Sequence, residues 1–144
     1  MALMVAVLAL GATSCKKKGC IDSNANNYNS EAKKDDGTCA YPVIIMSGSG
    51  TSGDISGGGG SASASQTFTQ NTPLLDWDMD INASTGSFNL TVKDAGGTTV
   101  VNRTLTAGTG AQDASGVSTS GTPGTWTATV TLTSFTGTGD YSFQ

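Results

Sequence analysis

Apolar and polar residues alternate one by one along much of the second half of the chain. Three stretches, 74–82, 86–94 and 124–133, carry an apolar side chain at every second position. These apolar residues are Leu75, Trp77, Met79, Ile81, Phe88, Leu90, Val92, Trp126, Ala128, Val130 and Leu132. A period of two is typical of antiparallel strands with one buried face and one wet face.

The alternation and the turn signals between its segments predict six strands. We expect them over 66–70, 74–82, 86–94, 98–107, 124–133 and 138–144. Turns are predicted at 84–86 and 94–97, where small and turn-forming residues cluster. Two sheets packed through their apolar faces form a sandwich, and both tryptophans fall in phase with its core. The predicted fold class is all-β, a small antiparallel β-sandwich over 66–144.

Between the apolar positions of 74–82 stand three aspartates, Asp76, Asp78 and Asp80. Carboxylates at alternate positions of one strand lie about 6.5 to 7 Å apart, which is too far for one small ion without help from a neighbouring strand. We interpret them as a solvated face that discourages aggregation. The long segment 107–124, whose only charge is Asp113, is predicted to be a loop and a binding edge.

Upstream of the predicted domain, the stretch 47–65 consists mostly of glycine, serine and alanine. Such a composition has almost nothing to bury and is typical of a flexible coil. We therefore expect 47–65 to be a linker between the sandwich and a separate N-terminal module over 15–46.

Composition excludes several classes of function. The chain of 144 residues has a net charge of -4 and no histidine. After Gln66 only Lys93 and Arg103 stand against six aspartates, so no basic patch for nucleic acid exists there. No cysteine follows Cys39. Without histidine or a spare thiol, the chain lacks the commonest general base and the best nucleophile, and we predict no catalytic residues and no enzyme activity.

The first 14 residues are apolar and then small, which is typical of a secretory signal and too short for a membrane span. The sequence LALGATSC, followed by Lys16 to Lys18, resembles the lipoprotein signals of Bacteroidota. That resemblance implies acylation of Cys15, attachment to the outer membrane and exposure on the cell surface. The alternative is an ordinary signal peptide followed by a free Cys15. Lys16 to Lys18 would lie at lipid headgroups or form a solvated run.

Cys20 and Cys39 enclose 18 residues. In an exported protein two cysteines so placed predict a disulfide, which would stabilise the loop by about 3 kcal/mol. Inside the loop only Ile21, Tyr28 and Ala32 are expected to be buried.

The enclosed segment resembles a short module of Bacteroidota surface proteins, GC-x-D-x-x-A-x-N-Y-N-x-x-A-x-x-D-D-G-[ST]-C. The matching residues are Gly19, Cys20, Asp22, Ala25, Asn27, Tyr28, Asn29, Ala32, Asp35, Asp36, Gly37, Thr38 and Cys39. The resemblance implies an extracytoplasmic location and no particular activity.

The same loop carries oxygen ligands at calcium-loop spacing. Asp22, Asn24 and Asn26 stand at alternate positions, Tyr28 could offer its carbonyl, and Asp35 with Asp36 could complete the shell. Lys33 stands where a calcium loop has its bidentate Glu. If calcium binds this loop, the missing Glu predicts weak affinity. The alternative is that these residues form turns.

The segment GTPGTWTATVTLTSFTGTGDYSF, 121–143, resembles the closing hairpin of immunoglobulin-like or pre-peptidase-like domains. Such domains are structural or binding modules. We therefore predict a non-enzymatic, lipid-anchored envelope protein whose sandwich binds a protein partner or a matrix component. The alternative is a carbohydrate-binding surface module, for which Phe68, Phe135 and Tyr141 would supply exposed aromatic rings.

Overall fold

The computed structural model describes residues 16–144, and all regular secondary structure in this range is β. The strands are β1 (Val43–Met46), β2 (Ser52–Gln70), β3 (Asp76–Lys93), β4 (Thr99–Thr106), β5 (Gln112–Val117) and β6 (Gly124–Phe143). The leader 1–14 and the predicted lipidation site Cys15 lie outside the described residues. Within residues 16–144 no helix has the length and apolar character to cross a bilayer.

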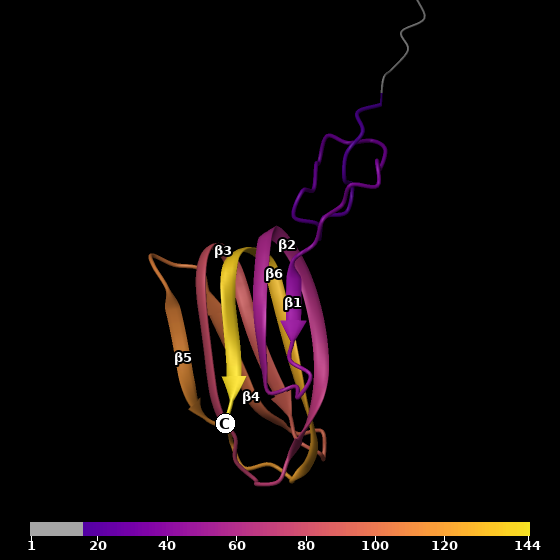
Figure 1. Ribbon diagram of the computed structural model, residues 1–144. Helices are drawn as coiled ribbons and strands as arrows, with labels where there is room; N and C mark the ends of the chain where they lie inside the picture. The colour runs from indigo at the N-terminus through magenta and orange to yellow at the C-terminus, as the bar shows by residue number, and fades with distance from the viewer. Residues whose placement is uncertain (1–15) are drawn as a thin grey trace, which may run out of the picture.

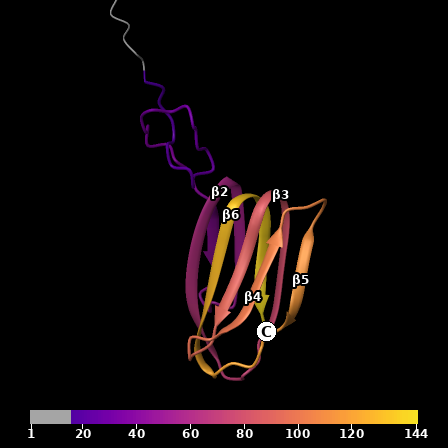
Figure 2. The same ribbon diagram turned by 180° about the vertical axis from the view of Figure 1, so that it is seen from behind.

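The six strands form one antiparallel sheet that folds over on itself into two layers (Figures 1 and 2). Its order is β1-β2-β6-β3-β4, and β5 pairs with β3. The front layer contains β1, the first half of β2, the second half of β6, the first half of β3, and β5. The back layer contains the other halves of β2, β6 and β3, and β4. The predicted all-β sandwich is confirmed.

The three longest strands pass through both layers, which the sequence did not predict. The expected strands 74–82 and 86–94 are one strand, β3, and 124–133 and 138–144 are one strand, β6. Register shifts between Ala83 and Ser87 and a positive φ of 82° at Gly86 mark the bend in β3. In β6 the bend includes Ser134, whose φ is 46°. Bulges bend a strand without reversing it, so these turn-forming residues carry the chain from one layer to the other.

The prediction of a flexible linker over 47–65 is wrong. Most of this segment belongs to β2, whose first part pairs with β1 on one side and with β6 on the other. Neighbouring side chains leave no room for larger residues here, because a Cβ at Gly53 would lie 2.6 Å from Cε1 of Tyr141. The sandwich therefore begins at Val43, and the proposed boundary at Gln66 falls inside a strand.

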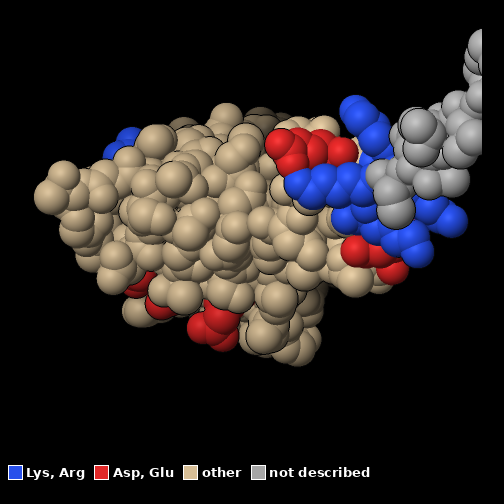
Figure 3. All heavy atoms as spheres, turned by 90° about the horizontal axis from the view of Figure 1, so that it is seen from above, with Lys and Arg blue, Asp and Glu red and all other residues tan. Residues whose placement is uncertain are grey.

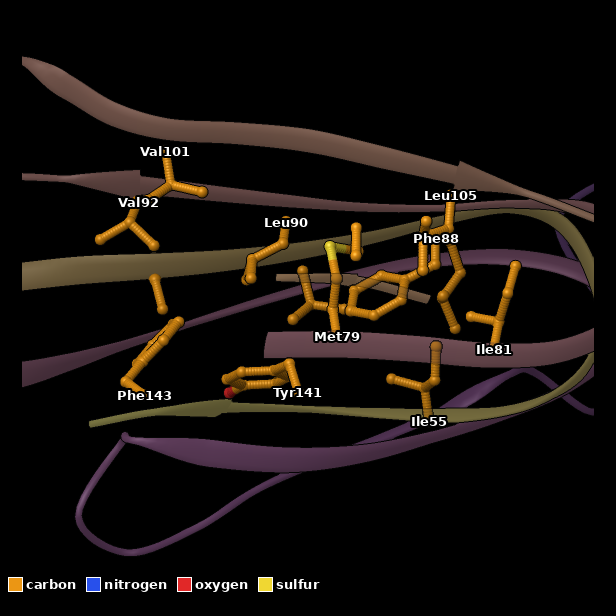
Figure 4. Packing of buried hydrophobic residues seen from close by; sticks show 14 of the residues in the cluster. Ile55, Met79, Ile81, Phe88, Leu90, Val92, Val101, Leu105, Tyr141 and Phe143 are labelled. Atoms are coloured by element: carbon orange, nitrogen blue, oxygen red, sulfur yellow. The ribbon is translucent and has the colours of Figure 1, made fainter. Parts of the chain in front are cut away.

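The core lies between the two layers. Trp126 and Phe88 from the back layer and Tyr141 and Met79 from the front layer are almost fully buried, and Figure 4 shows several of these side chains facing one another. Trp77 is partly buried against the edge of this cluster. Trp126 therefore belongs to the core, as predicted, whereas Trp77 lies at its rim. Among the described side chains the buried Tyr141 hydroxyl has no hydrogen-bond partner, and burial raises the pKa of Tyr141 to about 12.

The predicted turn at 94–97 is built around Asp94. Its carboxylate accepts hydrogen bonds from the backbone N–H groups of Thr122, Thr98 and Gly96 at 2.7, 2.7 and 3.0 Å. These bonds, that of Thr122 first, hold the pKa of Asp94 below its ordinary value. Asp94 thus joins the β3–β4 turn to the segment that enters β6.

The segment 107–124 is not the long free loop that we expected. Residues Gln112–Val117 form β5, which pairs with β3 at the edge of the front layer. The segment is long because it contains this added edge strand. The strand shows no clear alternation of apolar and polar residues, because some of its inward positions are small, such as Gly116 beneath the Trp77 ring.

Residues 16–42 form a compact unit closed by the Cys20–Cys39 disulfide, and we call this unit the knot (Figure 1). The pairing is the one expected from the sequence, but the knot's interior is smaller than predicted. Ala32 is buried, together with Cys20 and Ala25, whereas Ile21 and Tyr28 are about half exposed. A loop of this size closes around small side chains and leaves its large ones outside.

The knot is docked onto the bend of β2. The Asn26 side-chain oxygen accepts hydrogen bonds from the backbone N–H groups of Gly58 and Gly60, both at 3.1 Å. The carbonyl oxygen of Asn24 accepts a further bond from the Ser61 N–H at 2.8 Å. A Cβ at Gly60 would lie 2.4 Å from that carbonyl oxygen. Gly58 and Gly60 therefore let the knot pack closely against β2, and we call this part of the strand the β2 seat.

Candidate functional site

The side-chain oxygens of most of the residues predicted to bind calcium accept hydrogen bonds from other groups of the protein. One Asp22 oxygen accepts the Asn24 N–H, and Asn26 bonds to β2. Asp35 accepts from the Gly37 N–H, and Asp36 accepts from the Thr38 N–H and hydroxyl.

The backbone of Tyr28 forms a β-bridge with that of Cys20. Across residues 16–144, no three acidic or thiol side chains converge in a way that could hold a metal ion. Calcium binding stays a prediction, and the observed bonds are those of the alternative, turn formation.

The knot and the back layer instead border a shallow, open cleft of ≈ 660 Å³, which we call the knot cleft. Its knot side consists of Asp22, Asn24 and Tyr41. Its sandwich side is formed by residues of β2 and β6, namely Ser61, Ala62, Ser63, Thr131, Leu132 and Thr133. The cleft exists because the bend of β2 holds the knot against the end of this layer.

On the knot side a tyrosine and a carboxylate are fixed together. The Tyr41 hydroxyl donates a hydrogen bond to Asp22 at 2.8 Å, and the other oxygen of Asp22 accepts the Asn24 N–H at 2.9 Å. These bonds, that of the Asn24 N–H first, lower the pKa of Asp22, and the bond to Asp22 raises the pKa of Tyr41. At neutral pH the cleft therefore presents an ionised carboxylate beside the protonated phenol of Tyr41, a residue that is 47% exposed.

The sandwich side of the cleft is lined with hydroxyl groups. Ser63 and Thr131 stand on neighbouring strands with their hydroxyls 3.1 Å apart, and Ser63 also donates to the carbonyl of Val130 at 3.0 Å. The Ser61 hydroxyl accepts the Ser134 N–H at 3.0 Å. Because backbone groups hold these hydroxyls in place, the wall offers donors and acceptors in fixed positions.

A second polar surface covers the outside of the front layer. Strand register aligns four aspartates in one row, Asp54 on β2, Asp140 on β6, Asp80 on β3 and Asp113 on β5. No lysine or arginine belongs to these strand segments. Burial, and then the charges of Asp80 and Asp54, raise the pKa of Asp140. The predicted solvated face is therefore larger than Asp76, Asp78 and Asp80 alone.

Two hollows of ≈ 390 and ≈ 370 Å³ lie along this front face. The first is bordered by Asp76, Asp78, Ser115 and Val117, and the second by Val43, Ile45, Asp54 and Asp140. The indole of Trp77 packs toward the core and over Gly116. The first hollow thus includes Trp77 in its lining, whereas the second offers only carboxylates, small polar groups and aliphatic edges.

The aromatic residues expected to contact a carbohydrate are in the core. Phe68, Phe135 and Tyr141 are 5%, 0% and 1% exposed. These residues alternate with small polar residues in the sequence, a pattern that indicates burial, and all three side chains point between the layers. The exposed tyrosines are Tyr28 and Tyr41 on the knot. The sequence analysis assigned no role to Tyr41, although its position two residues after Cys39 could have placed it on the rim of the knot.

No protein-family model matches the chain, and no curated protein matches it. Among solved structures, the chain is similar to TmCBM61 in complex with β-1,4-galactotriose, with 14% identity, a TM-score of 0.43 and coverage of 72% of this chain and 68% of the other.

It is also similar to a CBM4 structure, with 15% identity, a TM-score of 0.45 and coverage of 72% and 86%. A third similar structure is the enzymatically active domain of tailspike protein 4 from bacteriophage CBA120. The identity is 10%, the TM-score is 0.40, and the match covers 76% of this chain and 16% of that one. Likenesses this distant carry no argument about function, which must come from the surfaces of this chain.

Proposed function

We propose that the chain is a non-enzymatic binding module of the cell envelope and that the knot cleft binds a sugar. The observation that carries this proposal is the pairing of the exposed Tyr41 ring and the Asp22 carboxylate with the hydroxyl wall of β2 and β6. The volume of the cleft, ≈ 660 Å³, is in the range of small-ligand sites.

Sugar chemistry fits each wall of the cleft. The C–H face of a pyranose ring packs against an aromatic face, which Tyr41 supplies. Sugar hydroxyls donate to carboxylates and both donate to and accept from serine and threonine hydroxyls. Asp22 is ionised and acts only as an acceptor, while Ser63, Thr131 and Thr133 line the opposite wall. A neutral sugar satisfies this arrangement, whereas an anionic sugar would meet the charge of Asp22.

Replacing Tyr41 by alanine should weaken sugar binding about tenfold, because an aromatic contact contributes about 0.5 to 1.5 kcal/mol beyond its buried area. Glycan arrays would identify the ligand, and calorimetry would measure the change. Tyr28→Ala is a matched control, since Tyr28 is also on the knot and is 48% exposed, close to the 47% of Tyr41. Tyr41→Phe keeps the ring but removes the bond to Asp22. Equal losses in the two alanine variants would contradict a site in the cleft.

A protein partner of the envelope is the competing hypothesis, and it needs no contact with the cleft. Co-purification from native membranes would separate the two. A stable protein partner whose binding is unchanged in Tyr41→Ala, together with no glycan binding on arrays, would replace the sugar proposal.

We also propose that acylated Cys15 anchors the protein to the outer membrane, with the module at the cell surface. Support comes from the leader and from the lysines that follow Cys15 in the sequence. Intact-mass analysis of protein from membranes should show a diacylglycerol-modified N-terminus at Cys15. Cys15→Ser should move the protein to the salt-extractable fraction, because serine lacks the thiol that carries the acyl chains and the variant therefore loses this anchor. A mature N-terminus elsewhere would exclude this anchor.

A further inference from the structure

The basic residues of the knot come together from two separate segments of the sequence. The Lys33 N–H donates to the Lys17 carbonyl at 2.8 Å, and the Gly19 N–H donates to the Lys34 carbonyl at 3.1 Å. The backbones of Lys18 and Lys34 form an isolated parallel β-bridge. These contacts bring Lys17 and Lys18 beside Lys33 and Lys34, Lys16 precedes them in the sequence, and all five lysines are exposed. We call them the lysine cluster, and Figure 3 shows most of the visible basic side chains gathered on the knot.

The knot also exposes its two largest apolar side chains. Ile21 is 51% exposed and Tyr28 is 48% exposed, although a free-standing loop would gain from burying both. Lysine stems, tyrosine and isoleucine together are typical of surfaces that lie at a lipid–water boundary, where charged heads meet headgroups and apolar groups enter the acyl edge.

The knot has four acidic residues, Asp22, Glu31, Asp35 and Asp36, and each makes a contact within the knot. Glu31 is paired with Lys17. Asp22 bonds to Tyr41 at the cleft, and Asp36 caps the Thr38 turn. Between residues 16 and 42 five lysines stand against four acidic residues, so the knot has a net charge of +1. The lysines lie at the end of the knot that continues toward residue 15, while the row of four aspartates lies on the front layer of the sandwich.

We propose that the lysine cluster, with Ile21 and Tyr28, docks the knot on the surface of an anionic lipid bilayer. An anionic bilayer is the expected partner because its headgroups complement the lysines and its acyl edge accommodates the two exposed apolar side chains, which a soluble polyanion would leave in water. Docking would hold the knot against the membrane and leave the sandwich, on the far side of the β2 seat, facing outward. The proposal does not depend on sugar binding or on acylation.

The test uses the full mature chain carrying Cys15→Ser, so that no acyl group contributes. Vesicles of phosphatidylethanolamine and phosphatidylglycerol in equal parts should bind the chain, and phosphatidylcholine vesicles should not. Each lysine near an anionic surface strengthens binding about fivefold, so the double variant Lys33→Gln and Lys34→Gln should lose at least tenfold. High salt should release the protein. Glu31→Gln frees Lys17 and should strengthen binding.

The matched control is the double variant Lys93→Gln and Arg103→Gln, which removes two exposed charges of the sandwich and should leave vesicle binding unchanged. Circular dichroism would verify that every variant is folded. Equal binding to both kinds of vesicle, or equal losses in the two double variants, would overturn the proposal. Tighter binding to soluble heparin than to anionic vesicles would also overturn it. Ile21→Ser with Tyr28→Ser should weaken binding about tenfold, and an unchanged affinity would contradict the apolar part of the surface.

Discussion

A chain that begins at Gln66 should fail to fold. Truncation there removes β1 and most of β2, whose first part pairs with β1 on one side and with residues Gly137 to Ser142 of β6 on the other. It also removes Ile55 from the core and uncovers the ring of Tyr141 beside Gly53. The remaining front layer would keep an unpaired strand edge next to an exposed apolar core, which favours aggregation.

The measurement is urea unfolding followed by circular dichroism on two fragments, 66–144 and 42–144. The longer fragment retains every strand and should unfold in one cooperative transition, whereas the shorter one should show none. Cooperative unfolding of 66–144 would mean that the glycine-rich part of β2 is dispensable. The comparison therefore tests whether 47–65 is part of the domain or a tether to it.

Replacing Trp126 by alanine should lower the free energy of unfolding by about 3 to 5 kcal/mol, because removal of a fully buried indole leaves a cavity. Trp126 is 0% exposed, its ring centroid lies 6.3 Å from that of Phe68, and its Nε1–H donates to the Thr122 carbonyl at 2.7 Å. Loss of the indole would also leave that carbonyl without this donor. A domain with a typical stability of about 5 to 15 kcal/mol would lose much of it.

Trp77→Ala is the natural comparison, because Trp77 is only partly buried and rests against the core at the β5 edge. It should cost clearly less than Trp126→Ala in the same urea experiment. Equal costs for the two tryptophans would contradict the placement of Trp126 at the centre and Trp77 at the rim. Sugar binding should persist in both folded variants, since neither side chain lines the knot cleft.

The two faces of the sandwich have different chemistry, and the knot adds a third surface. The back layer contributes neutral hydroxyls to the knot cleft, the front layer carries a row of aspartates, and the far side of the knot carries lysines. If the knot lies on the membrane, the cleft opens between the membrane-proximal unit and the sandwich. A sugar bound there would be held close to the cell surface.

The sequence by itself determined the strand faces and the core. A side chain in a strand points to the opposite face from its neighbour, so alternation placed Met79, Leu90 and Trp126 inside and the aspartates outside without any knowledge of the partners. The Cys20–Cys39 pairing was equally local, because few cysteines leave few choices. Turn chemistry at Asp94 was also visible, since its carboxylate bonds within its own turn and to the segment before β6.

Only the tertiary structure decided which glycine-rich segments form strands and where the binding surfaces lie. Gly53 and Gly60 have no intrinsic preference for a strand, and they adopt one because β1, β6 and the knot surround them. In the same way, serine and glycine at 84–86 bend β3 instead of ending it, because both halves find partners in β6. The cleft joins Tyr41 to Thr131, and the lysine cluster joins Lys18 to Lys34. Such contacts between distant segments depend on how the layers and the knot pack, which no local pattern of residues encodes.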